Sequence, residues 1–186
     1  MTRIVAGDLG GRRISAPPGR DTRPTSDRVR EALFSTLESM TDIAGCRFAD
    51  LYAGSGAVGL EAASRGAASV LLVEADTRAA RTVRANIAAL DLAARCELIV
   101  GRVPAALATP PKRPYDVVFA DPPYELADSE VAELLRALVA SRWLAPDAVV
   151  VVERSARSPE PARVEGITPE RGRRYGESML WYLRGS

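Results

Sequence analysis

The clearest structural signal in the chain is the run Phe48-Ala49-Asp50-Leu51-Tyr52-Ala53-Gly54-Ser55-Gly56-Ala57-Val58-Gly59-Leu60-Glu61. It reads as an apolar strand, a tight glycine turn and the start of a helix. Gly54 and Gly56 let the backbone turn sharply and come close to a ligand, and Gly59 lets the helix pack tightly on the strand. Glu74, which closes the next apolar strand, can accept hydrogen bonds from ribose hydroxyls. This pattern predicts a nucleoside-containing cofactor at the carboxyl edge of a parallel sheet.

The same run matches G-x-G-x-x-G and has an acid 20 residues after its first glycine, which is a signature of dinucleotide binding. Asp50 argues against a dinucleotide, because its carboxylate would face the helix N-terminus at which pyrophosphate binds, and two anions repel there. A cationic amino group in that place would be attracted to Asp50. S-adenosylmethionine carries an ammonium, a sulfonium and a ribose without phosphate, so it is the predicted cofactor. A nicotinamide oxidoreductase and a glycine turn without a ligand are the alternatives.

The second chemical motif is Asp121-Pro122-Pro123-Tyr124, which follows directly on the apolar strand Asp116–Ala120. The two prolines fix φ, so the turn is stiff and its carbonyl groups point in fixed directions. The carboxylate of Asp121 and the carbonyl of Pro122 can hold both hydrogens of an exocyclic amine and favour a pyramidal nitrogen with a usable lone pair. Tyr124 can stack on the base, which is worth about 1–3 kcal/mol. The tetrad predicts methylation of a nucleobase amine, and the alternative is a stiffened strand exit with a packing tyrosine.

From residue 47 onward, apolar runs of strand length alternate with amphipathic helical stretches. The expected strands are Arg47–Tyr52, Ser69–Glu74, Glu97–Val100, Asp116–Ala120, Ala148–Glu153, Arg171–Arg174 and Met179–Leu183. The expected helices between them are Ala57–Arg65, Thr77–Leu90, Val103–Ala108 and Ser129–Trp143. This order predicts an α/β fold with a mostly parallel seven-stranded sheet and helices on both faces. Because only a short turn separates the last two strands, they are expected to form an antiparallel hairpin.

The N-terminal part of the chain has a different pattern. Two short extended runs, Thr2–Ala6 and Arg12–Ala16, flank a glycine-rich turn and predict a β-hairpin. Ser26 can cap a helix that runs to about Met40. The apolar stripe of that helix consists of Val29, Leu33, Phe34 and Leu37. We therefore divide the chain into an N-terminal hairpin extension with its linker, residues 1–24, and a catalytic domain, residues 25–186.

Length and composition narrow the class of protein. The chain has 186 residues, of which 47% are hydrophobic and 26% charged, as expected for one globular domain with a short appendage. No apolar run approaches the roughly 20 residues of a membrane span, and the first residues lack the apolar core of a secretory signal, so we expect a cytoplasmic protein. The absence of histidine excludes histidine bases and histidine-ligated metals, and two isolated cysteines cannot form a zinc ribbon. We therefore expect no metal.

Charge is distributed unevenly along the chain. Residues 1–30 carry seven Arg against three Asp, or +4, and residues 154–186 carry seven Arg against four Glu, or +3. The middle, residues 31–153, holds eleven basic and seventeen acidic residues, or −6. Basic ends around an acidic middle indicate that the termini contact a polyanion. Chance scatter of charge is the alternative.

Together these motifs resemble the class I S-adenosylmethionine-dependent methyltransferases, which have a Rossmann-like fold. More closely, the chain resembles the RsmD family, bacterial enzymes that methylate the N2 amine of a guanine in 16S rRNA of the small ribosomal subunit. The segments that carry the resemblance are Arg3–Gly7, Gly11–Ile14, Arg23–Phe34, Asp50–Gly56, Asp121–Tyr124 and Gly176–Ser178. They cover nearly the whole chain in the order of the family. The Arg23–Phe34 segment is the most particular to RsmD.

The resemblance implies roles for individual residues. Asp121, Pro122, Pro123 and Tyr124 are expected to face the target amine. Arg23 and Thr25 are expected to close over the methionine end of the cofactor. The other expected cofactor contacts are Asp50, Tyr52, Gly54, Gly56, Glu74, Ala75, Arg102 and Asp121. Arg102 departs from the pattern of the fold, because many relatives have an acidic or amide residue near the adenine there. Adenine recognition is then expected to rest on backbone groups.

The resemblance also implies that RNA is the partner and that the N-terminal hairpin touches it. The expected RNA contacts are Arg3, Arg12, Arg13, Arg28 and Arg30. For the arginines of the first helix, a solvated basic helix start is the alternative. The expected substrate is 16S rRNA in the small ribosomal subunit or its precursor, and the expected state is a monomer. An adenine-N6 methyltransferase acting on DNA or RNA and a non-enzymatic RNA-binding accessory factor remain the other functional readings.

Overall fold

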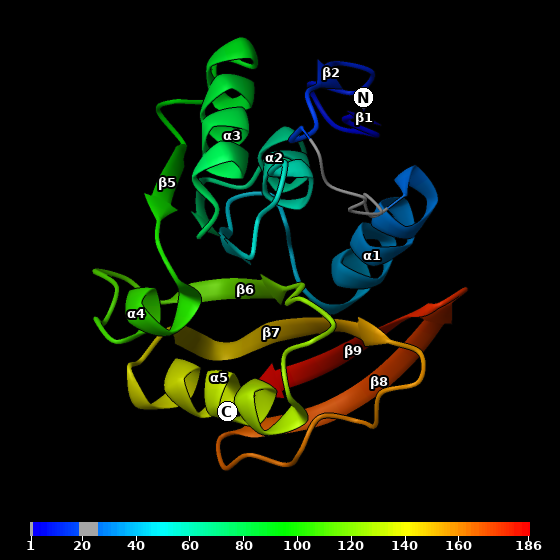
Figure 1. The fold of residues 1–186 in the computed structure, drawn as a ribbon, viewed down its shortest axis with the longest axis vertical. Coiled ribbons are helices and arrows are strands. Elements are labelled where there is room, and N and C mark those ends of the chain that lie inside the picture. Colours follow the sequence, from blue (N-terminus) through cyan, green and yellow to red (C-terminus); the bar gives the residue numbers. More distant parts are fainter. Residues whose placement is uncertain (1, 19–25) are drawn as a thin grey trace.

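Seven strands form one central sheet. The computed structural model describes residues 2–18 and 26–186. The strands are β3 (Arg47–Leu51), β4 (Ser69–Glu74), β5 (Cys96–Val100), β6 (Tyr115–Ala120), β7 (Leu144–Ser155), β8 (Ile167–Tyr175) and β9 (Ser178–Gly185). Their order across the sheet is β5-β4-β3-β6-β7-β9-β8 (Figure 1). The first five are mutually parallel, and β9 pairs antiparallel with both β7 and β8. The predicted sheet with its antiparallel C-terminal hairpin is confirmed.

Helices cover both faces of this sheet. They are α1 (Asp27–Met40), α2 (Ala57–Ser64), α3 (Thr77–Ala89), α4 (Val103–Leu107) and α5 (Asp128–Ala140). One buried cluster joins α1, α2 and α3 to the sheet, and a second joins α4 and α5 to its other face (Figure 1). Because β7 is covered on both sides, Val149–Val152 is an uninterrupted apolar run with no exposed surface.

Several element boundaries differ from the predicted ones. The predicted helix Ser129–Trp143 begins one residue earlier and ends at Ala140. It ends there because Arg142 is left-handed, with φ 55°, and Trp143 turns into the core, where its ring stacks on Tyr115 at 5.4 Å. The C-terminal strands are longer than predicted, since polar and charged positions continue their ladder beyond the apolar centre.

The N-terminal hairpin pairs over two residues on each side, β1 (Thr2–Arg3) and β2 (Arg13–Ile14). The predicted strands were longer. They are shortened because the backbone turns to other partners: the N–H of Val5 donates to Glu61 of α2 at 2.9 Å, and the N–H of Ser15 donates to Asn86 of α3 at 2.9 Å. The hairpin therefore rests on the helices that cover the sheet, and its two isoleucines are buried in the same cluster as α1–α3.

Candidate active site

Four acidic side chains come to the carboxyl edge of the sheet from four adjacent strands. In spatial order they are Glu74 of β4, Asp50 of β3, Asp121 directly after β6 and Glu153 of β7. Asp50 pairs in register with the β4 and β6 residues that lie two positions before Glu74 and Asp121. Because side chains alternate along a strand, all four point to the face that α1–α3 cover. The predicted cofactor acids and the predicted catalytic acid thus lie in one row.

Asp50 is the most buried member of this row, with 1% of its surface exposed. Its Oδ2 accepts the backbone N–H of Gly59 in α2 at 2.9 Å. Burial raises the pKa of Asp50 to about 7, the Gly59 hydrogen bond lowers it, and the charge of Glu74 raises it further. A cationic group beside this carboxylate would favour its charged form. The donor set therefore fits the ammonium group of S-adenosylmethionine and does not fit a pyrophosphate.

The glycine loop is held by backbone geometry and by Glu74. Three residues of the loop are left-handed: Tyr52 with φ 63°, Gly54 with φ 61° and Gly56 with φ 83°. Glu74 accepts the N–H of Gly54 at 2.7 Å through Oε2 and the N–H of Asp76 at 3.0 Å through Oε1. Each carboxylate oxygen can accept a second hydrogen bond, so Glu74 can hold the loop and still bind ribose hydroxyls. Tyr52 bears about 1–3 kcal/mol of strain, a feature without a sequence signal.

The Asp121 turn lies next to the glycine loop. The N–H of Asp121 points to the carbonyl of Leu51, the last residue of β3, at 3.5 Å. Burial raises the pKa of Asp121 well above its usual range, and the charges of Glu153 and Asp50 raise it further, whereas Arg154 lowers it. The predicted tetrad and the predicted cofactor loop therefore share one electrostatic environment.

The rest of the tetrad forms the rim of the site. Pro122 is buried, Pro123 is exposed, and the side chain of Tyr124 is among the few large apolar ones at the surface, with 53% exposed. A free aromatic face suits stacking on a base. Of the other predicted cofactor contacts, Ala75 is exposed directly after Glu74, and Arg102 is exposed at the start of α4. Arg23 and Thr25 lie outside the described residues.

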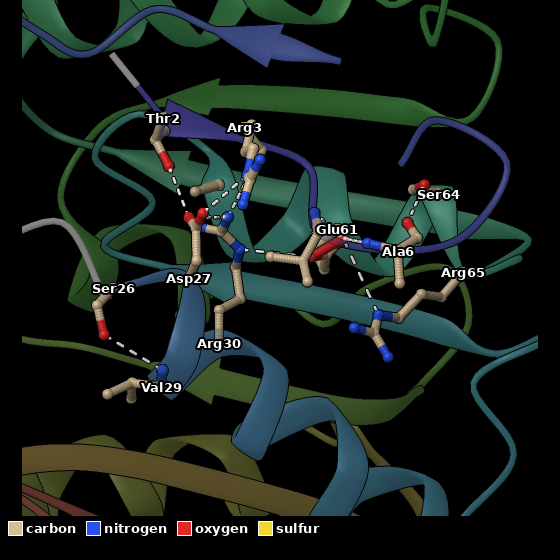
Figure 2. A network of polar contacts seen from close by, with 12 residues as sticks. Thr2, Arg3, Ala6, Ser26, Asp27, Val29, Arg30, Glu61, Ser64 and Arg65 are labelled. Carbon is tan, nitrogen blue, oxygen red and sulfur yellow. Dashed lines mark hydrogen bonds and ion pairs between the residues drawn. The ribbon is translucent and has the colours of Figure 1, made fainter. Parts of the chain in front are cut away.

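Arg30 does not lie where the sequence placed it. Figure 2 shows its guanidinium between the N-terminal hairpin, α1 and α2. It has no exposed surface, its Nε lies 3.4 Å from Glu61, its Nη2 lies 3.1 Å from Asp27, and Nη2 also donates to the carbonyl of Arg3. The prediction that Arg30 contacts RNA is therefore wrong, because the side chain is used to anchor the hairpin.

The other predicted RNA contacts are at the surface. Arg3, Arg12, Arg13 and Arg28 are exposed on the hairpin and the first turn of α1. Arg3 pairs with Asp27 at 3.0 Å, with 65% of its side chain exposed, and Arg12 donates to a carbonyl at the end of α3 at 2.9 Å. Because their side chains are exposed, these four arginines can contact a polyanion without a change in the fold.

Two buried side chains that sequence reasoning missed join the hairpin to the helices α2 and α3. Asn86 of α3 accepts the N–H of Ser15 and donates to the carbonyls of Ser15 and Ser55, both at 3.0 Å. Glu61 of α2 accepts two backbone N–H groups of the hairpin and the guanidinium of Arg30. Nothing in the local pattern singles out Asn86. Glu61 follows the glycine motif closely, and its acidity in an apolar helix is a signal that could have been used.

Known proteins are similar to this chain over most of its length. The sequence family described as Conserved hypothetical protein 95 matches residues 2–184. Ribosomal RNA small subunit methyltransferase D of Escherichia coli is 38% identical over 151 residues, which are 81% of this chain and 73% of that protein. The chain belongs to the RsmD family. The resemblance drawn from the motifs is confirmed.

Solved structures confirm the fold class. The structure of yhhF from Escherichia coli has a TM-score of 0.86 and 32% identity, and the match covers 100% of this chain and 98% of that one. A more distant methyltransferase-fold structure, with a TM-score of 0.67 and 15% identity over 85% of this chain and 48% of its own, was solved in complex with SAH. This likeness supports the fold class. Within residues 2–18 and 26–186, no helix is both long and apolar enough to cross a membrane.

Proposed function

We propose that this RsmD-family protein transfers a methyl group from S-adenosylmethionine to the exocyclic N2 amine of a guanine in 16S rRNA, within the small ribosomal subunit or a precursor of it. The observation that supports this most directly is the adjacency of two loops. Asp50 and the glycine loop follow β3, Asp121 and its prolines follow the neighbouring β6, and a 3.5 Å contact joins the base of one loop to the other.

The β3–β4 half of the edge binds the cofactor in this proposal. Asp50 holds the ammonium group, Glu74 holds ribose hydroxyls, and the backbone of the Gly54–Gly56 loop lies against the nucleoside. When bound, S-adenosylmethionine supplies an electron-poor methyl carbon. The protein contributes by holding the cofactor in a fixed position. In-line placement of the reacting atoms at about 3–3.5 Å accounts for much of the rate enhancement of a transfer reaction.

The β6–β7 half orients the amine. Asp121 and the carbonyl of Pro122 accept its two hydrogens, and Tyr124 stacks on the base. The nitrogen becomes cationic after methyl transfer and is then strongly acidic, so its proton can leave without a dedicated base. The chain contains no histidine. Recognition of one base in structured RNA needs that base in a loop or flipped out of its stack.

RNA is held by the exposed arginines of the hairpin and by those of residues 157–174 rather than by a separate binding domain; in the latter range they are Arg157, Arg163, Arg171, Arg173 and Arg174. We expect weak, salt-sensitive binding to naked 16S rRNA and tighter binding to an assembled ribonucleoprotein surface. A filter-binding titration tests this. Tight binding to naked RNA that is insensitive to salt would contradict it.

The test of the activity is methyl transfer to ribosomal subunits from a strain that lacks the enzyme, with labelled S-adenosylmethionine and nucleoside analysis. We expect N2-methylguanosine at one 16S position, loss of transfer in Asp121→Ala, and normal transfer in Glu133→Gln, which changes an exposed acid of α5. N6-methyladenosine would support the adenine alternative. Binding of a nicotinamide dinucleotide in place of S-adenosylmethionine would support an oxidoreductase, and an unaltered biological effect of Asp121→Ala would support an accessory factor.

A further inference from the structure

Arg154 lies behind the tetrad loop and is not part of the acidic row. It is the residue after Glu153 on β7, and because side chains alternate along a strand it points to the opposite face of the sheet, towards α5. Only 3% of its surface is exposed. Its guanidinium reaches three acceptors: the carbonyl of Pro123 at 3.4 Å, the carbonyl of Leu126 at 2.7 Å and the carboxylate of Asp128 at 3.2 Å.

The segment that follows β6 has few other anchors. Pro122 and Pro123 have no N–H, so they cannot donate backbone hydrogen bonds that would hold the segment in place. The N–H of Leu126 donates to the carbonyl of Pro123 at 3.0 Å, which closes a turn. In the described part of the chain, Arg154 is the only residue whose side chain donates to a backbone carbonyl between Asp121 and Leu126. Its planar guanidinium carries five N–H donors that can reach two carbonyls and a carboxylate from different nitrogens, whereas a lysine has three donors on a single nitrogen.

We propose that Arg154 is a positioning residue for methyl transfer: it fixes the tetrad loop so that the Asp121 carboxylate and the Pro122 carbonyl meet the substrate amine in a productive direction. This inference rests on the proposed function. Arg154 makes its hydrogen bonds on the far side of the loop from the row of acids, so it acts through the loop and not on the substrate. Its positive charge also favours the ionised form of Asp121, the form that accepts hydrogen bonds from an amine.

Arg184 provides a matched control. Its guanidinium makes the same kinds of contact, with Glu170 at 2.9 Å and with the carbonyls of Asp147 at 3.2 Å and Met40 at 3.4 Å. It lies near the other end of the β7–β9 pair, since it is in register with Val149, whereas Arg154 is in register with Met179. Replacement of either arginine removes similar hydrogen bonds, but only one of them lies behind the tetrad.

The experiment compares Arg154→Met and Arg154→Lys with Arg184→Met in the full chain. For Arg154→Met we expect kcat for methyl transfer to fall about 10–100-fold, the cost of a small misplacement of reacting groups. The Kd for S-adenosylmethionine, measured by titration calorimetry, should stay within about twofold of the wild-type value, because the cofactor half of the edge is not touched. Arg154→Lys should recover less than half of the loss. Arg184→Met should keep the wild-type kcat even if it melts at a lower temperature.

Two further measurements separate positioning from general stability. Methylguanidine added to Arg154→Ala should restore part of kcat and should have no effect on Arg184→Ala. Amide hydrogen exchange in the peptide 121–128 should be at least about tenfold faster in Arg154→Met than in Arg184→Met. Wild-type kcat and wild-type exchange in a folded Arg154→Met would overturn the inference, as would an equal loss of cofactor binding and rate. Failure of the wild-type protein to methylate any base would instead refute the proposed function, and the exchange measurement would still decide the role of Arg154 in the loop.

Discussion

The buried ionic network of Figure 2 makes a quantitative prediction about stability. Arg30 and Glu61 both have no exposed surface, so Arg30→Met leaves the Glu61 carboxylate buried with only the longer ionic contact to Arg65, at 3.9 Å. Removal of one partner from a buried ion pair costs about 3–5 kcal/mol. We expect the lower half of this range, because Glu61 keeps hydrogen bonds from the N–H groups of Val5 at 2.9 Å and Ala6 at 3.3 Å. For a chain of this length, 3–4 kcal/mol corresponds to a drop in Tm of roughly 6–16 °C.

The assay is urea unfolding followed by circular dichroism, with Arg3→Met as the matched control. Arg3 belongs to the same network, but its ion pair with Asp27 is largely exposed, so its loss should cost less than about 1 kcal/mol. The double variant Arg30→Met/Glu61→Gln should be less destabilised than the sum of its single variants by about 1–3 kcal/mol, because the two residues share one interaction. If Arg30→Met unfolds within 1 kcal/mol of Arg3→Met, or if the double variant is additive, the network does not anchor the hairpin and our reading of Arg30 is refuted.

Three further predictions concern the acidic row. In the wild-type protein, affinity for S-adenosylmethionine should rise as the pH rises through about 7, because Asp50 loses its proton there. Asp50→Asn should bind the cofactor about 10–100-fold more weakly, and its affinity should not rise over this pH range. Titration calorimetry measures both. Glu153→Gln removes a like charge beside Asp121, lowers the pKa of that acid, and should shift the acidic limb of the kcat/KM profile to lower pH. Gly59→Ala places a Cβ 3.2 Å from Asp50, so it should lower the free energy of unfolding by about 1–3 kcal/mol and weaken cofactor binding. In Gly54→Ala the new Cβ meets nothing within 4 Å, so the free energy of unfolding should fall only by the strain of a φ of 61°, about 1–2 kcal/mol. Thermal melting measures both costs.

Local patterns of the sequence predict most of the fold, because burial and backbone conformation restrict which residue types occur at each position. Strands that are buried on both faces must be apolar throughout, so Val149–Val152 can be recognised as a buried strand from the sequence alone. The glycine loop can be predicted because few residues other than glycine adopt the left-handed conformation found at Gly54 and Gly56. Register and face then follow from alternation along parallel strands, which is why the acids of β3 and β6 could be expected at one edge.

The misassigned residues are those whose surroundings come from distant parts of the chain. Arg30 was interpreted as a surface charge, yet it lies three, four and seven positions before Leu33, Phe34 and Leu37, on the buried stripe of α1. Its spacing was a usable signal. Its partner Glu61 could not be found in that way, because the contact joins two helices about 30 residues apart in sequence. Arg154 was missed because the apolar run of its strand ends at Val152 and the predicted strand ends at Glu153, directly before it.

The acidic row has a physical rationale that neither half of the site provides alone. Carboxylates on adjacent strands repel one another: Glu74 raises the pKa of Asp50, and Asp50 and Glu153 raise the pKa of Asp121. Such an arrangement destabilises the free protein and becomes favourable when positive charge is brought to the edge. In the proposed reaction, the ammonium group of the cofactor would lie beside Asp50, and the substrate nitrogen that becomes cationic would lie beside Asp121. Negative charge in the row can therefore stabilise the cationic nitrogen that methyl transfer produces, and this stabilisation needs no histidine, a residue that the chain lacks.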